Sequence, residues 1–351
     1  MNPLGLPAGR QLPLFVPSEV LLPASTTVEP TPARRLSEAV EAYCTYLVAA
    51  GRAMHTVRST RLDLQGLLEH IGDESLLDLA PAQLAEHVRW LRSERGNSSS
   101  SLRRKIATLK TFLRYAVTAG WIAESPAEGL VYPQLKRAPV IVLDSHEVEA
   151  VVAAGSVDPA WHALVLLFVD AGLKRDEALA LQAEDLYLAR EPSDSRVTIR
   201  HSAQAKRVRR RSVPLTARAH FALARLLRAP LPGGPVFSFS VRGVNFVIET
   251  VGRRAEIVRL KKLTPEILRD TFAVRIMRER VNNESEALRH GRSAREFARL
   301  RAKHDVEVLQ LLGLSRYSEM AARYRSAVAA IEASATGNTD TATRGGALKH
   351  E

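Results

Sequence analysis

Apolar residues at helical spacing recur through residues 37–129 and constrain the fold more than any other feature of the sequence. The clearest stretch follows the serine run Ser98–Ser101, where successive apolar positions are four or three residues apart. These positions are Leu102, Ile106, Leu109 and Leu113. Such spacing gathers the side chains on one face of a helix. We expect about four helices in this part of the chain, with Ser37 as the N-cap of the first.

The second half of the chain combines helical patterns with one segment of alternating residues. Asp144–Glu147 is typical of a helix start, and the apolar run 163–169 predicts a helix buried on several sides. Between Arg196 and Leu215, apolar and polar residues alternate, which predicts a small antiparallel hairpin. From Leu263 onward the pattern is helical again. The expected fold class is therefore mainly α with a small antiparallel sheet.

The length of 351 residues exceeds that of one ordinary domain, so we expect two domains with flanking segments. The predicted division has a proline-rich arm at 1–35, a helical domain at 36–131, a basic linker at 132–141, a second domain at 142–334 and a flexible tail at 335–351. The linker contains Lys136 and Arg137.

The charge balance favours a polyanionic partner, because 50 Lys and Arg face 38 Asp and Glu, a formal net charge of +12. A soluble basic protein without such a partner is the alternative. The single cysteine, Cys44, excludes an internal disulfide and a cysteine-based zinc site. We find no export signal or apolar run long enough to span a membrane, so we expect a cytoplasmic protein.

Four motifs in the second half resemble, in order, the active-site boxes of the tyrosine recombinase (phage integrase) family. They are Ala171–Leu181, Ala205–Leu215, Leu263–Ala273, and Leu311–Ser315 followed by Met320–Arg325. The resemblance covers roughly residues 37–330. It implies that Tyr324 attacks a DNA phosphate, that Lys206 protonates the leaving oxygen and that Arg269 binds the phosphate. It implies no metal and no cofactor.

Three positions depart from the family pattern. Lys174 stands where the family has arginine, although Arg175 follows it directly, and lysine lacks the planar fork that binds phosphate bidentately. Glu266 replaces a histidine and brings a negative charge toward the phosphate. Leu314 replaces a histidine or tryptophan and donates no hydrogen bond. Together these departures predict weakened or lost cleavage, because each removes stabilisation of the transition state.

The motif that carries the nucleophile is also irregular. Leu314 and Tyr324 are one residue further apart than the family pattern leads us to expect, and a charged insertion at 281–304 precedes this motif. Tyr317 is therefore a rival nucleophile. The helix 326–333 after Tyr324 is a candidate contact with a neighbouring protomer.

The family resemblance implies a helical SAM-like core-binding domain and an α-rich catalytic-type domain that close around duplex DNA as a C-shaped clamp. Candidate DNA-binding residues are Arg103, Lys110, Arg114, Lys136, Arg137, Arg207, Arg209, Arg210 and Arg211. The charged helix face that holds the first three is equally consistent with an ordinary solvated surface.

Three functions remain open at this point. The first is a recombinase, integrase or transposon enzyme that cleaves DNA. The second is an inactive architectural or targeting subunit of such a complex, and the third is a regulator that reuses the fold. Expected partners are double-stranded DNA and further copies of the chain or partner recombination proteins, at the bacterial nucleoid.

Overall fold

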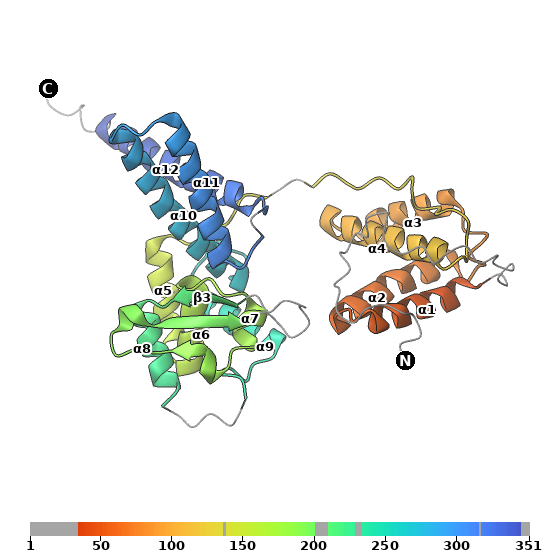
Figure 1. The fold of residues 1–351 in the computed structure, drawn as a ribbon, viewed down its shortest axis with the longest axis horizontal. Coiled ribbons are helices and arrows are strands. Elements are labelled where there is room, and N and C mark those ends of the chain that lie inside the picture. Colours follow the sequence, from red (N-terminus) through yellow and green to blue (C-terminus); the bar gives the residue numbers. More distant parts are fainter. Residues whose placement is uncertain (1–33, 136–137, 201–209, 229–233, 316, 345–351) are drawn as a thin grey trace. The chain divides into compact units, whose positions relative to one another are not determined.

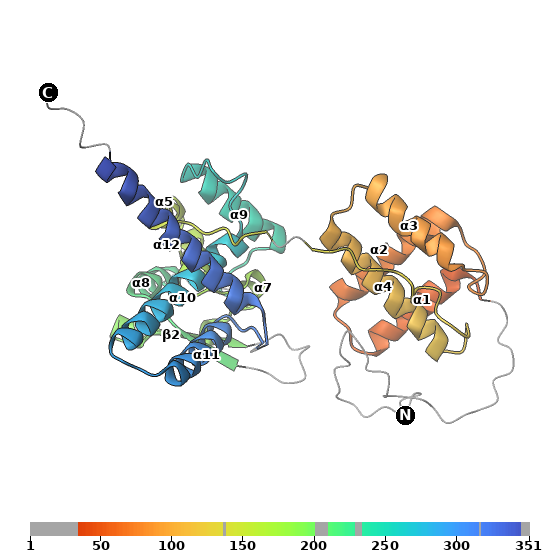
Figure 2. The same ribbon diagram turned by 90° about the horizontal axis from the view of Figure 1, so that it is seen from above.

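The computed structural model describes residues 34–135, 138–200, 210–228, 234–315 and 317–344. These residues form two compact units, which are described separately below (Figures 1 and 2). The described residues of the first unit end at Leu135, and the second unit begins at Ala138. Helices dominate both units, as the apolar spacing predicts.

Among its described residues, the first unit contains four helices, which are α1 (Leu36–Ala49), α2 (Met54–Ile71), α3 (Pro81–Ser93) and α4 (Ser99–Thr118). The predicted N-cap of α1 is wrong by two residues, because Arg35 occupies that position and Ser37 lies in the first turn. Asp73 serves the exposed end of α1 instead. Its carboxylate accepts hydrogen bonds from the backbone N–H of Ser37 at 2.8 Å and from the Ser37 hydroxyl at 2.9 Å.

Helix α4 matches its prediction closely. Ser98 is the N-cap, and its hydroxyl oxygen accepts a hydrogen bond from the backbone N–H of Ser101. The four apolar residues of the predicted stripe are all buried in the core of this unit or beside it. Burial of one such side chain contributes roughly 1.5–3 kcal/mol, so the stripe holds α4 against its neighbours.

The second unit contains eight α-helices among its described residues, together with a three-stranded sheet. The helices are α5 (Ser145–Gly155), α6 (Pro159–Val169), α7 (Arg175–Leu179), α8 (Ala217–Leu226), α9 (Val241–Arg254), α10 (Pro265–Arg289), α11 (Ala294–Leu311) and α12 (Met320–Arg344). The strands are β1 (Leu186–Tyr187), β2 (Arg196–Arg200) and β3 (Arg210–Pro214), antiparallel in the order β1-β2-β3. The predicted hairpin is β2 and β3, and β1 extends it.

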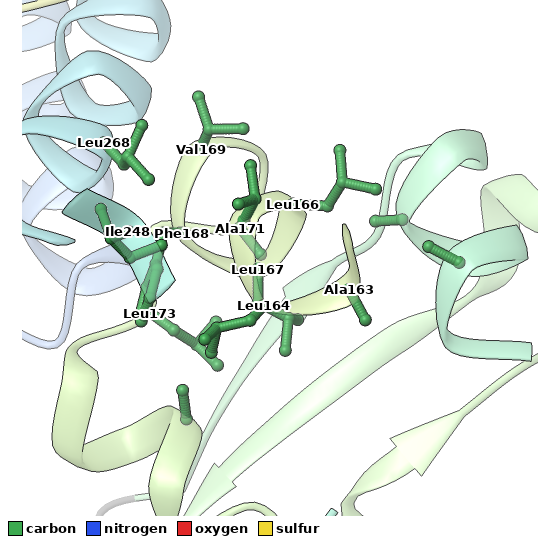
Figure 3. Packing of buried hydrophobic residues seen from close by; sticks show 14 of the residues in the cluster. Ala163, Leu164, Leu166, Leu167, Phe168, Val169, Ala171, Leu173, Ile248 and Leu268 are labelled. Atoms are coloured by element: carbon green, nitrogen blue, oxygen red, sulfur yellow. The ribbon is translucent and has the colours of Figure 1, made fainter. Parts of the chain in front are cut away.

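Helix α6 forms the centre of this unit. Every residue from Ala163 to Val169 is fully buried, as the apolar run predicts (Figure 3). Figure 3 shows Ile248 of α9 and Leu268 of α10 in the same cluster as these side chains. The predicted start of α5 is confirmed, because Asp144 and Glu147 form a reciprocal capping box. The core therefore fixes α9 and α10 against α6, and α10 carries part of the candidate site.

Helices α10, α11 and α12 form a second apolar cluster at one end of this unit (Figure 1). The charged insertion 281–304 builds the end of α10 and the first part of α11. The composition predicts a flexible tail from residue 335, whereas α12 continues to Arg344. Val328, in the segment expected to reach a neighbouring protomer, is buried in this cluster instead.

None of the described helices combines the length and the apolar character needed to cross a bilayer.

Candidate active site

The loop between α6 and α7 lines one side of the candidate site. Gly172 in this loop has a φ of 61°, a left-handed conformation that favours glycine. A β-carbon at Gly172 would also lie only 2.3 Å from Cδ1 of Phe272 on α10. Glycine is therefore required for both the turn and the close approach of α10. The loop ends at Lys174, whose backbone N–H donates to Oε2 of Glu177 at 2.7 Å.

Glu177 and Arg211 form a buried pair that joins α7 to strand β3. The two terminal nitrogens of Arg211 donate to the two carboxylate oxygens of Glu177 at 2.6 and 2.7 Å. Burial opposes ionisation of Glu177, but the hydrogen bonds from Arg211 outweigh it and lower the pKa of Glu177. Arg211 also donates from Nε to the carbonyl of Leu311 at 2.9 Å. Arg211, which the sequence analysis predicts to bind DNA, is only 10% exposed. Its side chain instead joins strand β3 to α7 and to the end of α11.

Arg269 on α10 is buried and holds two backbone segments together. Its terminal nitrogens donate to the carbonyls of Gly172 and Leu312, each at 2.6 Å. Burial lowers the pKa of Arg269, while nearby Glu177 opposes that effect. Arginine remains charged in proteins, so Arg269 places a fixed positive charge between the first and last motifs.

Tyr324 of α12 is buried in the apolar cluster that α12 forms with α10 and α11. Its side chain is 1% exposed, and its hydroxyl donates to Oδ1 of Asp270 at 2.9 Å. Burial raises the pKa of Tyr324, and the negative charge of Asp270 raises it further. Asp270 directly follows Arg269 on α10. The candidate nucleophile therefore contacts the residue next to Arg269. Its hydroxyl is hydrogen-bonded to the carboxylate of that residue.

An open depression of about 510 Å³ lies between α7, α9 and the start of α10. Its charged lining residues are Lys174, Arg175, Lys262, Arg269, Asp176, Glu249 and Glu266. Burial lowers the pKa of Lys174, whose ammonium donates to the carbonyl of Gly313 at 3.3 Å. Four cations and three carboxylates line the depression, which leaves an excess of one positive charge.

Glu266 is exposed in the first turn of α10 and lines the depression. Its charge acts on both Lys174 and Tyr324. A helix N-terminus attracts anions, so Glu266 occupies a position where a phosphate oxygen would otherwise be favoured. The prediction that this residue opposes phosphate binding thus has a geometric basis.

Two further sequence predictions concern the end of the site. Leu314 is half-buried and packs on the apolar cluster that contains Tyr324, so it contributes packing and no hydrogen bond. Tyr317 is 78% exposed, in contrast to Tyr324. Tyr324 is held beside the residues of the third motif by its hydrogen bond to Asp270.

The candidate DNA-binding residues of the first unit make contacts within that unit. The guanidinium of Arg103 and the ammonium of Lys110 both lie over the ring of Tyr132. Lys110 also donates to the carbonyl of Glu128 at 3.0 Å, and Arg114 pairs with the Glu128 carboxylate at 3.3 Å. These cations lie along α4, and the Glu128 carboxylate partly neutralises Arg114.

Several predicted site residues fall outside the described residues. These are Lys136, Arg137, Lys206, Arg207 and Arg209. Arg210 is described, and it is exposed at the start of β3 opposite Arg200 on β2.

Sequence reasoning missed two residues of the site. Asp270 contacts the candidate nucleophile, and its position directly after Arg269 in the third motif was an available signal. Lys262 lines the depression and directly precedes the same motif. The family pattern of this motif specifies neither Asp270 nor Lys262, so the sequence analysis did not predict them as site residues.

Comparison with known proteins identifies relatives of both units. Residues 40–120 match the family model described as phage integrase, N-terminal SAM-like domain. The chain is 28% identical to tyrosine recombinase XerC of Xylella fastidiosa over 256 residues, which cover 69% of this chain and 84% of that protein. It is 29% identical to tyrosine recombinase XerC of Xanthomonas campestris over 253 residues, covering 68% and 76% of the two chains.

Solved structures resemble the fold of the chain. A lambda integrase dimer bound to a COC′ core site has a TM-score of 0.59 at 17% identity, covering 84% of this chain and 96% of that one. The XerH site-specific recombinase bound to a palindromic difH substrate also has a TM-score of 0.59 at 17% identity, covering 86% and 84%.

Proposed function

The chain belongs to the tyrosine recombinase family, and on that premise we propose that it binds double-stranded DNA and recombines it through a covalent bond to Tyr324. One observation carries the proposal. The cationic depression contains Arg269, and the residue next to Arg269 holds the Tyr324 hydroxyl. A nucleophile beside an anion-binding depression is the arrangement that phosphoryl transfer to tyrosine requires.

The reaction exchanges one phosphate ester for another. The Tyr324 oxygen bonds to phosphorus, the bond from phosphorus to the 5′ oxygen breaks, and the leaving oxygen takes up a proton. Lys174, Lys262 and the fixed charge of Arg269 would offset the charge that develops on the nonbridging oxygens. By family resemblance Lys206 supplies the proton. Attack by a 5′ hydroxyl reverses the step and seals the strand.

The proposal predicts a covalent adduct that depends on Tyr324. The substrate is a duplex that the protein selects from a random-sequence library, with a nick placed so that the released fragment diffuses away. Wild-type protein should become linked to DNA, and Tyr324→Phe should lose the adduct because it lacks the nucleophilic oxygen. Denaturing gel electrophoresis measures the adduct, and gel mobility shift measures binding.

Tyr317→Phe is the matched control, because it removes the hydroxyl of the rival tyrosine seven positions earlier. It should keep the adduct, whereas an adduct lost only in Tyr317→Phe would assign the nucleophile to Tyr317. Absence of any adduct from wild-type protein across nick positions on the selected duplex would contradict cleavage.

A second candidate function is a DNA-binding subunit that no longer cleaves. It is favoured by Lys174, Glu266 and Leu314 at positions where the family resemblance implies arginine, histidine, and histidine or tryptophan. For this function, Tyr324→Phe should leave both DNA binding and recombination in cells unchanged. Loss of recombination in cells with retained binding would exclude it.

We further propose that the protein acts as an oligomer on paired DNA sites at the bacterial nucleoid. The support is that the lambda integrase structure of similar fold is a dimer bound to its core site. In this proposal the two units are the core-binding and catalytic-type domains, joined by the segment 132–141.

A further inference from the structure

Asp270 differs from the other carboxylates that this protein buries. Each fully buried carboxylate of the described residues pairs with an arginine. These pairs are Asp63 with Arg104, Asp170 with Arg218, Glu177 with Arg211, Asp185 with Arg200 and Glu284 with Arg325. Within the described part of the chain, Asp270 has no Lys or Arg nitrogen within 4.0 Å. Its hydrogen-bond partner is the phenol of Tyr324 at 2.9 Å.

Charged groups surround this contact on two helices. From α10, Glu266 and Arg269 act on Asp270, and from α12, Arg323 does so beside Tyr324 itself. Burial, followed by the charge of Glu266, raises the pKa of Asp270 to about 6. At neutral pH the carboxylate is therefore mostly ionised, yet it takes up a proton more readily than an exposed aspartate does.

Tyr324 needs such a proton acceptor. Its pKa is raised by burial and by Asp270, so the phenolate is scarce at neutral pH and the neutral phenol is a weak nucleophile. A base within hydrogen-bond reach removes the proton as the new bond forms. Within the described residues, the carboxylate that contacts the hydroxyl is that of Asp270.

We propose that Asp270 is the catalytic base that accepts the Tyr324 proton during attack on the DNA phosphate. The inference rests on the proposed function. The proton moves from the Tyr324 hydroxyl to Oδ1 of Asp270 as the bond from oxygen to phosphorus forms. The bond to the 5′ oxygen breaks, and that oxygen is protonated by a separate general acid. When the 5′ hydroxyl attacks in the reverse step, Asp270 returns its proton to Tyr324.

The test is the rate of adduct formation by Asp270→Asn on the nicked duplex. Asparagine has nearly the same shape and keeps an oxygen that accepts the Tyr324 hydrogen bond, but it is not basic. We expect the rate on saturated DNA to fall about 100- to 10,000-fold, the usual contribution of a general base, while DNA binding is retained. Asp194→Asn, an exposed carboxylate in the same unit, should react like wild type.

A pH profile separates a base from a merely structural hydrogen bond. The wild-type rate should rise with pH up to about 6 and then level off, whereas the slower Asp270→Asn reaction should lack this limb. Asp270→Glu should recover part of the rate, because it restores a carboxylate.

The outcomes distinguish this inference from the proposed function. Equal rates for wild type and Asp270→Asn would overturn the inference alone. A faster reaction of Asp270→Asn would also overturn it, because the hydrogen bond to Tyr324 would then inhibit the attack. A wild-type protein that binds the selected duplex but forms no adduct would overturn cleavage, and with it the role of Asp270.

Discussion

At the scale of single residues, we expect Glu266 to weaken the affinity of the depression for a phosphate. It adds a negative charge among Lys174, Lys262 and Arg269, at a helix N-terminus that would otherwise attract anions. The side chain is exposed, so water screens part of the repulsion and the effect on binding is modest.

Glu266→Gln should therefore strengthen DNA binding, since it removes the repulsive charge and keeps the shape of the side chain. We expect about tenfold tighter binding, equivalent to about 1.4 kcal/mol. Fluorescence anisotropy at one fixed salt concentration measures the effect, because affinity for DNA varies strongly with salt. Glu279→Gln, an exposed carboxylate further along α10, is the control for a general change in net charge. Unchanged affinity for Glu266→Gln would place this carboxylate away from bound DNA.

Sequence motifs with fixed spacing singled out Arg269 and Tyr324, and Tyr324 contacts the residue next to Arg269. The motifs did not predict the burial of Arg211, which in the sequence is one member of a run of basic residues. Its burial depends on Glu177 and on Gly313, where a β-carbon would lie 2.3 Å from Nη1 of Arg211. Such contacts join segments distant in sequence, so local patterns do not contain them.

At the scale of elements, the long helices α10, α11 and α12 hold the nucleophile through a buried polar cluster. Glu284 of α10 accepts hydrogen bonds from His304 of α11 at 2.7 Å and from both terminal nitrogens of Arg325 at 2.8 Å. Arg325 directly follows Tyr324 and also donates to Asp305 at 2.6 Å. The charged insertion, an irregularity in the sequence, thus supplies the residues that fix α12.

Glu284→Ala should destabilise the protein by about 3–5 kcal/mol, because it leaves the Arg325 charge buried without its main partner. Chemical denaturation monitored by circular dichroism measures the free energy of unfolding. Glu286→Ala, two positions later on the same helix, removes an exposed carboxylate and should change stability by less than about 0.5 kcal/mol. Similar values for the two variants would show that the cluster does not hold α12.

Helix periodicity was sufficient to predict most elements of both units, since α4 and α6 follow directly from their apolar spacing. It was insufficient for helix ends. Asp73, distant in sequence, serves the start of α1, and the apolar packing of Val328 anchors a helix that continues to Arg344 through a segment with the composition of a tail. At the start of α1, a tertiary contact thus overrides the local signal.

At the scale of the whole molecule, one half-buried or buried group in each unit responds to acid with opposite sign. In the first unit, His87 of α3 is 1% exposed and packs beside His70 and Trp90. Burial, and then the charges of His70 and Lys105, lower the pKa of His87 to about 4. The second unit contains Asp270, whose raised pKa works in the opposite direction.

The linkage between protonation and folding gives the sign for each unit. Between about pH 6.5 and pH 4 the unfolded chain protonates His87 more readily than the folded unit does, so acid destabilises the first unit in this window. Asp270 stabilises the second unit below its unfolded pKa of 3.8, and this contribution is lost as the pH rises through about 6. Asp170 and Glu177 of the second unit act against Asp270, because their lowered pKa values make acid destabilise the folded state.

His87→Leu should abolish most of the acid sensitivity of the first unit. Nδ1 of His87 has no hydrogen-bond partner among the described residues, so an apolar side chain leaves no group there unpaired. Lowering the pH from 7 to 4 should cost the wild-type first unit about 2–3 kcal/mol, and the variant much less. Calorimetry at each pH, with the fluorescence of Trp90 as a local reporter, measures the transition. His55→Leu, an exposed histidine on α2, is the control and should keep the wild-type pH dependence, whereas an unchanged pH dependence in His87→Leu would assign the acid response to another group.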